Sequence, residues 1–221
     1  VAAVLGDDRV VALRQAADKA VGMGSLGRGD DLFVGGVGLA VSDTPTGPFA
    51  YMGSQRPGSH DSRDFTAFQD KDGRAYLFCS SDWNATMRIW ELDKTYTKWT
   101  GSGKEILIDQ AREAPALWHS GEKYLMFSSG CTGWSPNTML YAESSAIFGS
   151  WRLIDDPCRG PGARQTFGAQ SAAVFAANGQ PYILLDHWHP DDLRSSGYTI
   201  LPVTFENGLP TVNWQDEWLG I

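Results

Sequence analysis

The sequence is short of positive charge, of cysteine and of long apolar runs. Its 221 residues include 18 Lys and Arg against 26 Asp and Glu, a formal net charge of -8. Such a chain has no basic stripe to neutralise phosphates, which argues against nucleic acid and anionic membrane as partners. No apolar run approaches the roughly 20 residues that a membrane span needs, and we expect no signal sequence at Val1. A neutral ligand fits this composition better.

The three cysteines are Cys79, Cys131 and Cys158. None has a Cys-x-x-Cys or Cys/His spacing, which argues against a structural zinc site. Cys79 lies in an apolar strand pattern, where a buried thiol is the ordinary interpretation. Cys131 and Cys158 lie in segments flanked by Gly and Pro. We expect them to form a disulfide in an oxidising compartment, although the sequence alone does not establish connectivity.

A unit of about 50 residues occurs three times. Each copy begins with an apolar strand, continues through a glycine turn into a second strand led by an aromatic residue, and ends with a third strand and an edge segment closed by a tryptophan. The second strands and their turns cover residues 72–78, 120–126 and 178–184, and the closing residues are Trp99, Trp151 and Trp214. Four strands per unit without intervening helices are typical of propeller blades.

The N-terminal part follows this pattern only partly. Residues 37–42 with 47–49 match the second half of the unit, which predicts a half blade. Residues 10–20 look like a short amphipathic helix or a loop, and the glycines between 22 and 29 like a flexible connector. We therefore predict an all-β fold with about three and a half blades. It comprises a non-matching segment, 1–35, and a partial propeller, 36–221, and we expect the chain to be a fragment.

Three polar residues open the first strand of successive units. Asp64, Glu113 and Gln170 each lie eight or nine residues before the turn glycine of their unit. Because the innermost strands of a propeller line its central channel, we expect these side chains to converge in one pocket. A carboxylate directly before an apolar strand is costly without a partner, so a functional role is favoured over a surface loop.

Two carboxyl groups in this arrangement suit glycoside hydrolysis, which needs an acid to protonate the leaving oxygen. Glu113 is the candidate acid, because its apolar flank disfavours ionisation; Arg112 would oppose this effect if it pointed inward. Asp64 is the candidate for positioning that acid and binding sugar hydroxyls. The alternative for Asp64 is a salt bridge with Arg63.

Aromatic residues beside polar ones favour sugar binding, because pyranose faces are apolar and their rims need hydrogen bonds. Trp134, on a Gly/Pro-rich loop, is predicted to be a stacking platform rather than loop packing. Trp188 fits either role, whereas the three tryptophans that close units are assigned to the core. His187 and His189 alternate on a strand, but without a third ligand they are interpreted as hydrogen-bonded neighbours, not as a metal site.

Several motifs together resemble glycoside hydrolase family 43, and within it the exo-β-1,3-galactanase branch. The resemblance runs from about residue 36 to the end. It rests on Gly38-Leu39-Ala40-Val41-Ser42-Asp43 with Thr46-Gly47-Pro48-Phe49, Ser62-Arg63-Asp64, Arg112-Glu113-Ala114-Pro115-Ala116, Ser129-Gly130-Cys131-Thr132-Gly133-Trp134 and Phe167-Gly168-Ala169-Gln170-Ser171.

The resemblance implies a five-bladed propeller that hydrolyses with inversion. By motif, Glu113 matches the general acid, Asp64 the aspartate that tunes it, and Gln170 a glutamine that replaces the catalytic base through a rare imidic acid form. Thr132 and Trp134 belong to a loop that resembles the galactose-binding one. We include Asn137 of this loop and Trp188 among the predicted substrate contacts.

The implied partner is β-1,3-galactan or the side chains of arabinogalactan, and the implied location is the secretory pathway or the cell exterior. No cofactor is expected, and a structural calcium is left open. Family members carry a further blade and a sugar-binding glutamate before the segment matching Val37, which residues 1–35 lack; an inactive, shortened version is therefore one alternative. The others are an arabinofuranosidase or xylosidase, and a carbohydrate-binding propeller without catalysis.

Overall fold

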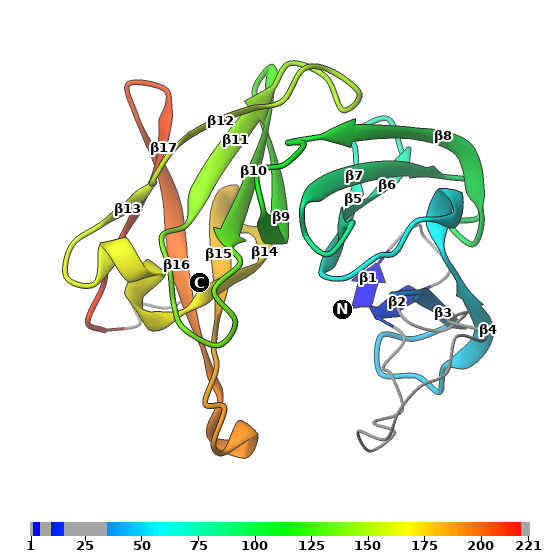
Figure 1. Cartoon of the computed structure of the whole chain (residues 1–221), viewed down its shortest axis with the longest axis horizontal. Coiled ribbons are helices and arrows are strands. Elements are labelled where there is room, and N and C mark those ends of the chain that lie inside the picture. Colours follow the sequence, from blue (N-terminus) through cyan, green and yellow to red (C-terminus); the bar gives the residue numbers. More distant parts are fainter. Residues whose placement is uncertain (1, 5–9, 16–34, 218–221) are drawn as a thin grey trace. The chain divides into compact units, whose positions relative to one another are not determined.

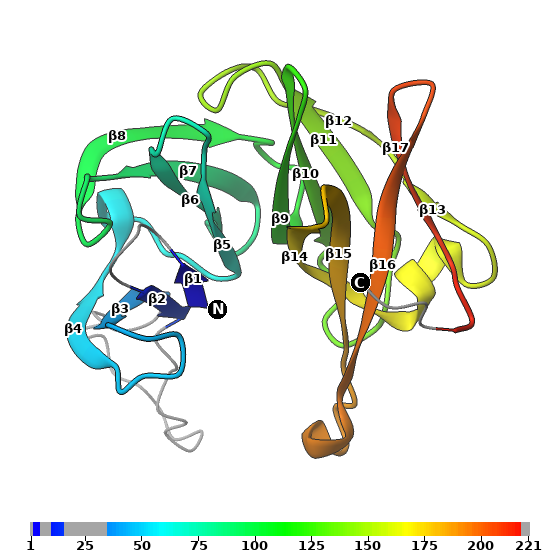
Figure 2. The same cartoon turned by 180° about the vertical axis from the view of Figure 1, so that it is seen from behind.

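The computed structural model describes residues 2–4, 10–15 and 35–217, and the chain divides into two compact units, Val1–Glu105 and Ile106–Ile221 (Figure 1). Both units are built from mainly antiparallel sheets, as the view from behind also shows (Figure 2). The helices found in the described residues are short 3-10 turns: η1 (Pro57–Ser59), η2 (Ala163–Gly168) and η3 (Leu193–Ser195). The predicted all-β class is confirmed.

The first sheet of the first unit has four strands in the order β1-β2-β3-β4. They are β1 (Ala2–Val4), β2 (Val10–Gln15), β3 (Val37–Ser42) and β4 (Ala50–Gln55). The prediction of a half blade here is therefore wrong, because β1 and β2 add two strands beside β3. The described sheets number four, each with at least four strands.

The prediction of a helix or loop at residues 10–20 is wrong for Val10–Gln15, which forms β2 and pairs along its whole length with β3. A short apolar run of this length does not distinguish a helix from a strand by periodicity, and the pairing with β3 decided the outcome. The rest of that segment and the glycines between 22 and 29 lie outside the described residues. The predicted domain boundary after residue 35 stays a prediction.

The second sheet of this unit runs in the order β5-β6-β7-β8. Its strands are β5 (Phe65–Gln69), β6 (Ala75–Ser81), β7 (Thr86–Leu92) and β8 (Trp99–Ile106). Strand β6 is buried along its whole length, because Val37 of the first sheet and the partly buried Trp99 pack into the same cluster as its Ala75, Leu77 and Cys79. The unit therefore has a core shared by its two sheets.

The second unit repeats the pattern twice. One sheet contains β9 (Arg112–Ser120), β10 (Lys123–Gly130), β11 (Leu140–Ser144) and β12 (Arg152–Asp155); the other contains β14 (Gln170–Ala177), β15 (Gln180–His187), β16 (Gly197–Glu206) and β17 (Leu209–Asn213). Together with the sheet of β5 to β8 in the first unit, these two sheets confirm the three repeats predicted from the sequence. The sequence did not indicate β13 (Cys158–Arg159), which pairs in parallel with β17 as a fifth strand.

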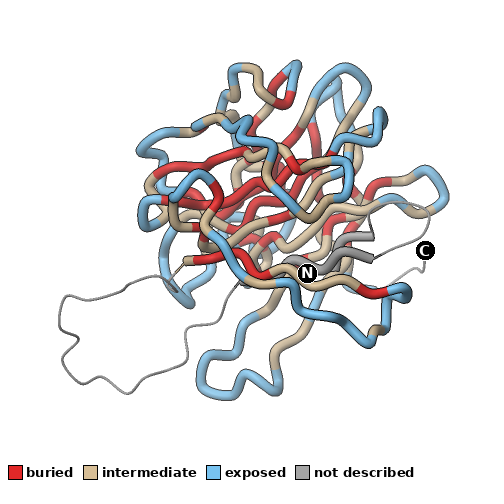
Figure 3. The backbone as a smooth tube through the Cα atoms, turned by 90° about the vertical axis from the view of Figure 1, so that its right-hand side faces the viewer, coloured by how far each residue is buried: buried red, intermediate tan, exposed pale blue. Residues whose placement is uncertain are grey.

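Buried residues form continuous stretches of the chain, and exposed ones gather at the outer turns (Figure 3). Strands β6 and β10 are mostly buried, whereas β4 is mostly exposed. In the second unit, the core joins both sheets through side chains such as Phe127 and Leu201, and Trp214 packs against its edge as predicted. Cys158 is part of this core, whereas Cys131 is exposed on a loop and its Sγ donates to the carbonyl of Ala111 at 3.2 Å. The expected disulfide between them is wrong, since both are thiols.

Candidate active site

The first strands of the two sheets in the second unit lie side by side. The Ser171 hydroxyl on β14 donates to the Ala114 carbonyl on β9 at 2.6 Å. Both strands appear next to each other in Figures 1 and 2. The residues that precede this contact, Glu113 and Gln170, therefore open neighbouring strands at the same level.

Both strands bulge within two residues of their site residue. On β9, Ala114 and Pro115 together face one residue of β10; Ala114 has a φ of 53° and Pro115 has no N–H to pair. On β14, the register shifts between Ser171 and Ala173. A bulge inserts one extra residue and changes the direction in which the neighbouring side chain points. A bulge therefore sets the orientation of Glu113 in one sheet and of Gln170 in the other.

Gln170 links Glu113 to β10 through its amide nitrogen. Gln170 Nε2 donates to Glu113 Oε1 at 3.1 Å and to Ser129 Oγ at 2.7 Å. Ser129 is buried and pairs directly with Glu113 across β9 and β10. Glu113 and Gln170 are half-buried. The three groups form a compact polar cluster held by strands from both sheets.

The sequence left open whether Arg112 points inward, and in the structure it does. Its guanidinium is buried and donates from Nε to Ser128 Oγ at 3.1 Å and from Nη2 to the Ser128 carbonyl. Burial lowers the pKa of Arg112 to about 10, and Cys131 and Glu113 oppose this lowering. Arg112 is therefore still a cation at neutral pH and places a fixed positive charge in the neighbourhood of Glu113.

Asp64 lies in the first unit, directly before β5. Its carbonyl accepts from the Ser80 N–H at 2.9 Å at the end of β6. Ser80 therefore lies opposite Asp64 in the way that Ser129 lies opposite Glu113 and Asp186 lies opposite Gln170. The structure therefore brings Glu113 and Gln170 into contact, and gives Asp64 the equivalent position in a sheet of the other unit.

The two tryptophans predicted to bind sugar lie against each other. Trp134, in the loop after β10, is 56% exposed, and Trp188, directly after β15, is 45% exposed. Their ring centroids are 5.5 Å apart in an edge-to-face arrangement. Two large aromatic rings thus share a solvent-facing surface at the ends of the strands that pair with β9 and β14.

The Asn137 side chain braces the loop that carries Trp134. Its Nδ2 donates to the Gly130 carbonyl at 2.8 Å and to Thr132 Oγ1 at 2.7 Å, and its Oδ1 accepts from the Gly130 N–H at 2.7 Å. Thr132 Oγ1 in turn donates to the Ser135 carbonyl at 2.5 Å. Asn137 therefore acts on the shape of the loop, whereas Thr132 is exposed within it.

The prediction that His187 and His189 alternate on one strand is wrong, because His187 is the last residue of β15 and His189 lies two residues beyond it. His187 Nε2 is 2.8 Å from Thr199 Oγ1, and His189 donates its backbone N–H to Ser196 Oγ at 3.1 Å. Within the part of the chain that the structure describes, no group of three His, Cys, Asp or Glu side chains could hold a metal ion. No helix among these residues has the length and apolarity to cross a membrane.

Trp83 is not among the residues predicted from the sequence, although the repeat contains a signal for it. Trp83, Trp134 and Trp188 come 19, 21 and 18 residues after Asp64, Glu113 and Gln170. Each follows the second strand of its sheet and is exposed. A search of the repeat for exposed aromatic positions, in addition to polar ones, would have found it.

Comparison with known proteins identifies the fold. The family model for glycosyl hydrolases family 43 matches residues 26–218. The comparison with curated protein sequences gave no match. Among solved structures, a family 43 β-1,3-galactosidase in complex with galactodeoxynojirimycin is 29% identical, with a TM-score of 0.87 over 96% of this chain and 73% of the other.

Two further structures are similar. A second family 43 β-1,3-galactosidase is 33% identical, with a TM-score of 0.87 over 95% of this chain and 43% of its own. The exo-β-1,3-galactanase of Phanerochaete chrysosporium with galactose is 29% identical, with a TM-score of 0.79 over 92% of this chain and 45% of its own. This chain spans less than half of these last two proteins. It has the propeller fold of its relatives and belongs to glycoside hydrolase family 43.

Proposed function

We propose that this chain carries the catalytic groups of an exo-acting β-1,3-galactosidase that releases terminal galactose with inversion. The observation that supports this most directly is the hydrogen bond from Gln170 to Glu113, which joins an acid and an amide at the starts of adjacent strands. The names of the similar structures, β-1,3-galactosidases and an exo-β-1,3-galactanase, support the choice of substrate.

In this proposal Glu113 is the general acid that protonates the glycosidic oxygen as the bond to the leaving sugar breaks. Gln170 fixes one oxygen of the carboxyl group, and the pairing of Glu113 with Ser129 fixes its backbone. A carboxyl group held in one orientation loses little entropy when the substrate arrives, which favours proton transfer along one line.

Gln170 also serves the attacking water. Both of its hydrogen bonds in the cluster are made by Nε2. For inversion, the hydrogen bond to Glu113 must open when a sugar enters between the two side chains, and the amide oxygen then accepts from the attacking water. A neutral amide is a weak base, and its contribution is mainly to orient the water. We assign Asp64 the role of binding sugar hydroxyls.

Trp134 and Trp188 supply the apolar surface that a galactose ring needs. The axial hydroxyl of galactose leaves one face of the ring with an apolar patch, which packs on an aromatic ring, while the hydroxyl groups at the rim hydrogen-bond to polar neighbours. The exposed edge-to-face pair matches this demand. Thr132, exposed on the same loop, is the candidate for such a hydrogen bond.

The test is release of galactose from β-1,3-galactan by the unmodified chain and by Glu113→Gln. Loss of release in Glu113→Gln, with Glu122→Gln as the control in an exposed turn, supports the proposal. Equal release by both proteins contradicts the role of Glu113. Binding of galactan without release by the unmodified chain favours a carbohydrate-binding propeller, and release from arabinofuranosides or xylosides instead of galactan changes the substrate.

A further inference from the structure

We propose that Thr166 is a positioning residue, which holds the loop of Trp134 and the start of β14 in one fixed arrangement. The inference rests on the proposed function and adds a residue to its site. Thr166 lies in η2, four residues before Gln170, and is 1% exposed. A polar side chain this deeply buried needs hydrogen-bond partners, and its partners connect two parts of the candidate site. Every residue of this arrangement belongs to the second unit.

The backbone at Thr166 has a conformation that such a residue rarely adopts. Thr166 and Phe167 have φ values of 49° and 59°, and Gly168 follows with 80°. A positive φ is ordinary for a glycine, but for a β-branched residue it is an outlier. Such strain persists only where the surrounding structure determines the conformation, and strained residues are concentrated at functional sites. Contacts with other segments must therefore hold Thr166 in place.

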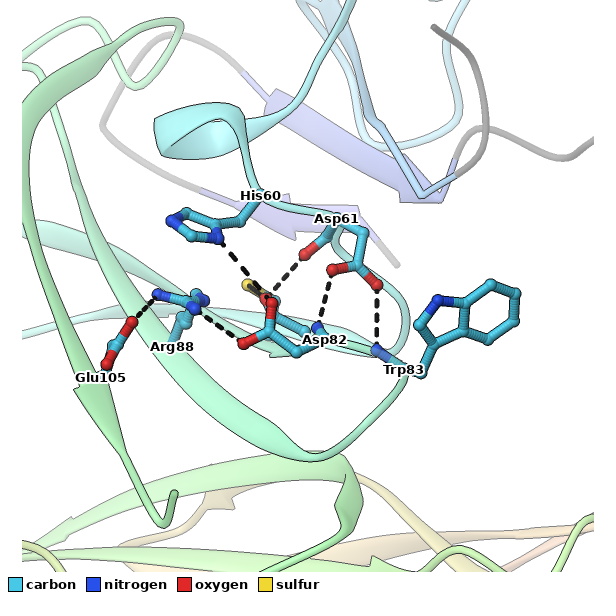
Figure 4. A network of polar contacts seen from close by, with 8 residues as sticks. His60, Asp61, Asp82, Trp83, Arg88 and Glu105 are labelled. Carbon is cyan, nitrogen blue, oxygen red and sulfur yellow. Dashed lines mark hydrogen bonds and ion pairs between the residues drawn. The ribbon is translucent and has the colours of Figure 1, made fainter. Parts of the chain in front are cut away.

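A turn in the first unit shows the same dependence on a single side chain. Asp82, Trp83 and Asn84 are three successive left-handed residues, with φ values of 52°, 58° and 69°. The Asp61 carboxylate fixes this turn by accepting from the Asp82 N–H at 2.7 Å and from the Trp83 N–H at 3.3 Å (Figure 4). In each of the two turns, a polar side chain joins the strained backbone to a segment that is distant in the sequence.

The hydroxyl of Thr166 binds the segment that leads from the loop of Trp134 to β11. It donates to the Asn137 carbonyl at 2.6 Å and accepts from the Met139 N–H at 2.9 Å. Because β11 begins at Leu140, these two backbone groups lie outside the ladder of the sheet. The hydroxyl thus supplies a donor and an acceptor to backbone that precedes the strand.

Asn137 carries this connection into the loop. Its carbonyl is bound by Thr166, while its side chain binds both backbone groups of Gly130 and the Thr132 hydroxyl. The main chain and the side chain of one residue therefore join η2 to the base of the loop. A shift of the Asn137 backbone would move its amide, and with it the loop that presents Trp134.

The main chain of Thr166 acts on the other side, at the start of β14. Its carbonyl accepts from the N–H of Ala169 at 3.0 Å, and Ala169 is a buried residue directly before Gln170. Phe167 anchors the turn to the core, because its ring packs against Trp214 with the two centroids 5.2 Å apart. Thr166 therefore binds the sugar loop through its side chain and the strand of Gln170 through its backbone.

A fixed arrangement of loop and strand serves the proposed reaction in two ways. Trp134 must hold the sugar while the Gln170 side chain turns from Glu113 to the attacking water, and the backbone of both residues must stay in place during that turn. A displacement of about 1 Å in an active site can lower the rate by on the order of 100-fold. The Thr166 hydroxyl therefore contributes to KM through the loop and to kcat through Gln170.

The experiment measures kcat and KM for the release of galactose from β-1,3-galactotriose. Thr166→Val removes the hydroxyl with little change of shape, and we expect kcat to fall about 10-fold and KM to rise about 3-fold. Thr166→Ser keeps the hydroxyl and should restore both values to within about 2-fold of the unmodified chain. Thr204→Val is the matched control, because Thr204 Oγ1 donates to the Thr211 carbonyl at 3.2 Å between β16 and β17. It should change neither value.

A double variant separates positioning from a general loss of structure. Because Thr166 acts on kcat through Gln170, Thr166→Val in the Gln170→Ala background should lower kcat by less than a further factor of about 2. A purely structural loss would lower kcat by the same factor in both backgrounds. Thermal unfolding checks that each protein is folded. If Thr166→Val does not fold, Thr166→Gly takes its place with the same expected results, since glycine adopts a positive φ readily.

Equal kcat in Thr166→Val and the unmodified chain overturns the inference and leaves the proposed function intact. So does a Thr166→Ser variant as slow as Thr166→Val, since that assigns the effect to packing and not to the hydroxyl. Equal factors in the two backgrounds overturn the inference as well. An unmodified chain that releases no galactose contradicts the proposed function together with the role of Thr166.

Discussion

Gln170 donates from its side-chain nitrogen to Glu113 Oε1 at 3.1 Å, although 57 residues separate the two in the sequence. The contact exists because each residue opens the first strand of its sheet and these strands are neighbours. An amide in this place can approach a carboxyl group closely in either protonation state. A second carboxylate at this distance would repel the first and raise the pKa of the pair.

Replacement of Gln170 tests this relationship. Gln170→Ala removes the donor to Glu113 and the partner of Ser129, and we expect galactose release to fall at least about 100-fold, the loss typical of a preorganised donor in an active site. Gln170→Glu places two carboxyl groups together, which raises the pKa of Glu113. Because Glu113 acts as the acid, we expect the alkaline limb of the pH–rate profile to move to higher pH.

Gln180→Ala is the matched control, because Gln180 donates to the Val203 carbonyl at 2.8 Å and lies at the start of β15, at the opposite end from the residue that pairs with Gln170. Its kcat should stay close to that of the unmodified chain. A Gln170→Ala variant with unchanged release, or a Gln170→Glu variant with an unchanged pH profile, would show that the hydrogen bond to Glu113 has no catalytic role.

Trp134 and Trp188 should bind sugar as a unit. Their rings touch edge to face, so loss of one ring releases its partner and reduces the contribution of both. We expect Trp134→Ala and Trp188→Ala each to weaken galactose binding, and the double variant to lose less than the sum of the single losses, with a coupling of about 0.5–1.5 kcal/mol. Calorimetry on the four proteins of this cycle gives the coupling. Strict additivity would contradict a shared platform.

The repeat made most of the fold predictable. The turn glycines and aromatic-led strands located β5 to β7, β9 to β11 and β14 to β16, because hairpins are specified locally by turn residues and alternating burial. Strand β2 was not predictable in this way. It pairs with β3 across a long interval of sequence, and its identity as a strand is decided by that non-local pairing.

The sequence predicted which strand positions the site residues occupy, but not the backbone conformation that orients their side chains. Counting from the turn glycines placed Glu113 and Gln170 on equivalent positions, and the structure brings them together. It did not reveal the bulges that aim them, since Ala114 adopts a positive φ that its sequence neighbours do not indicate. The left-handed turn at Trp83 was hidden for the same reason, because Asp61, which fixes it, comes from another segment.

The reactivity of the cysteines should separate one thiol from the other two. Cys131 is exposed, whereas burial raises the pKa of the Cys79 thiol to about 11 and also raises the pKa of Cys158. We expect one thiol to react rapidly with Ellman's reagent in the native protein and all three after denaturation without reductant. Cys131→Ser should remove the rapid reaction.

A disulfide between Cys131 and Cys158 gives a different count. The native protein would then have no rapid thiol, and one thiol would appear after denaturation without reductant. The thiol and disulfide states therefore differ by one rapidly reacting thiol in the native protein and by two reactive thiols after denaturation. The assay distinguishes the two states.

The stability of the second unit should depend on pH through Glu143. This side chain, on β11, accepts from Lys123 at 2.9 Å and from Arg152 at 2.8 Å on the strands to either side. The hydrogen bond from Lys123, followed by that from Arg152, holds the pKa of Glu143 below its usual value. The folded state therefore binds the proton less readily than the unfolded state does, so this stabilisation is present above the unfolded pKa and is lost as the pH falls through the folded pKa.

We expect Glu143→Gln to lower the free energy of unfolding at pH 7 by roughly 0.5–1 kcal/mol. The effect is small because solvent screens the exposed partners, Lys123 at 55% and Arg152 at 75%. At pH 2 the difference between the two proteins should be smaller, because Glu143 loses its charge as the pH falls through its folded pKa. Urea unfolding at the two pH values measures the difference, with Glu122→Gln as the control. Equal destabilisation at both pH values would mean that Glu143 acts through packing and not through its charge.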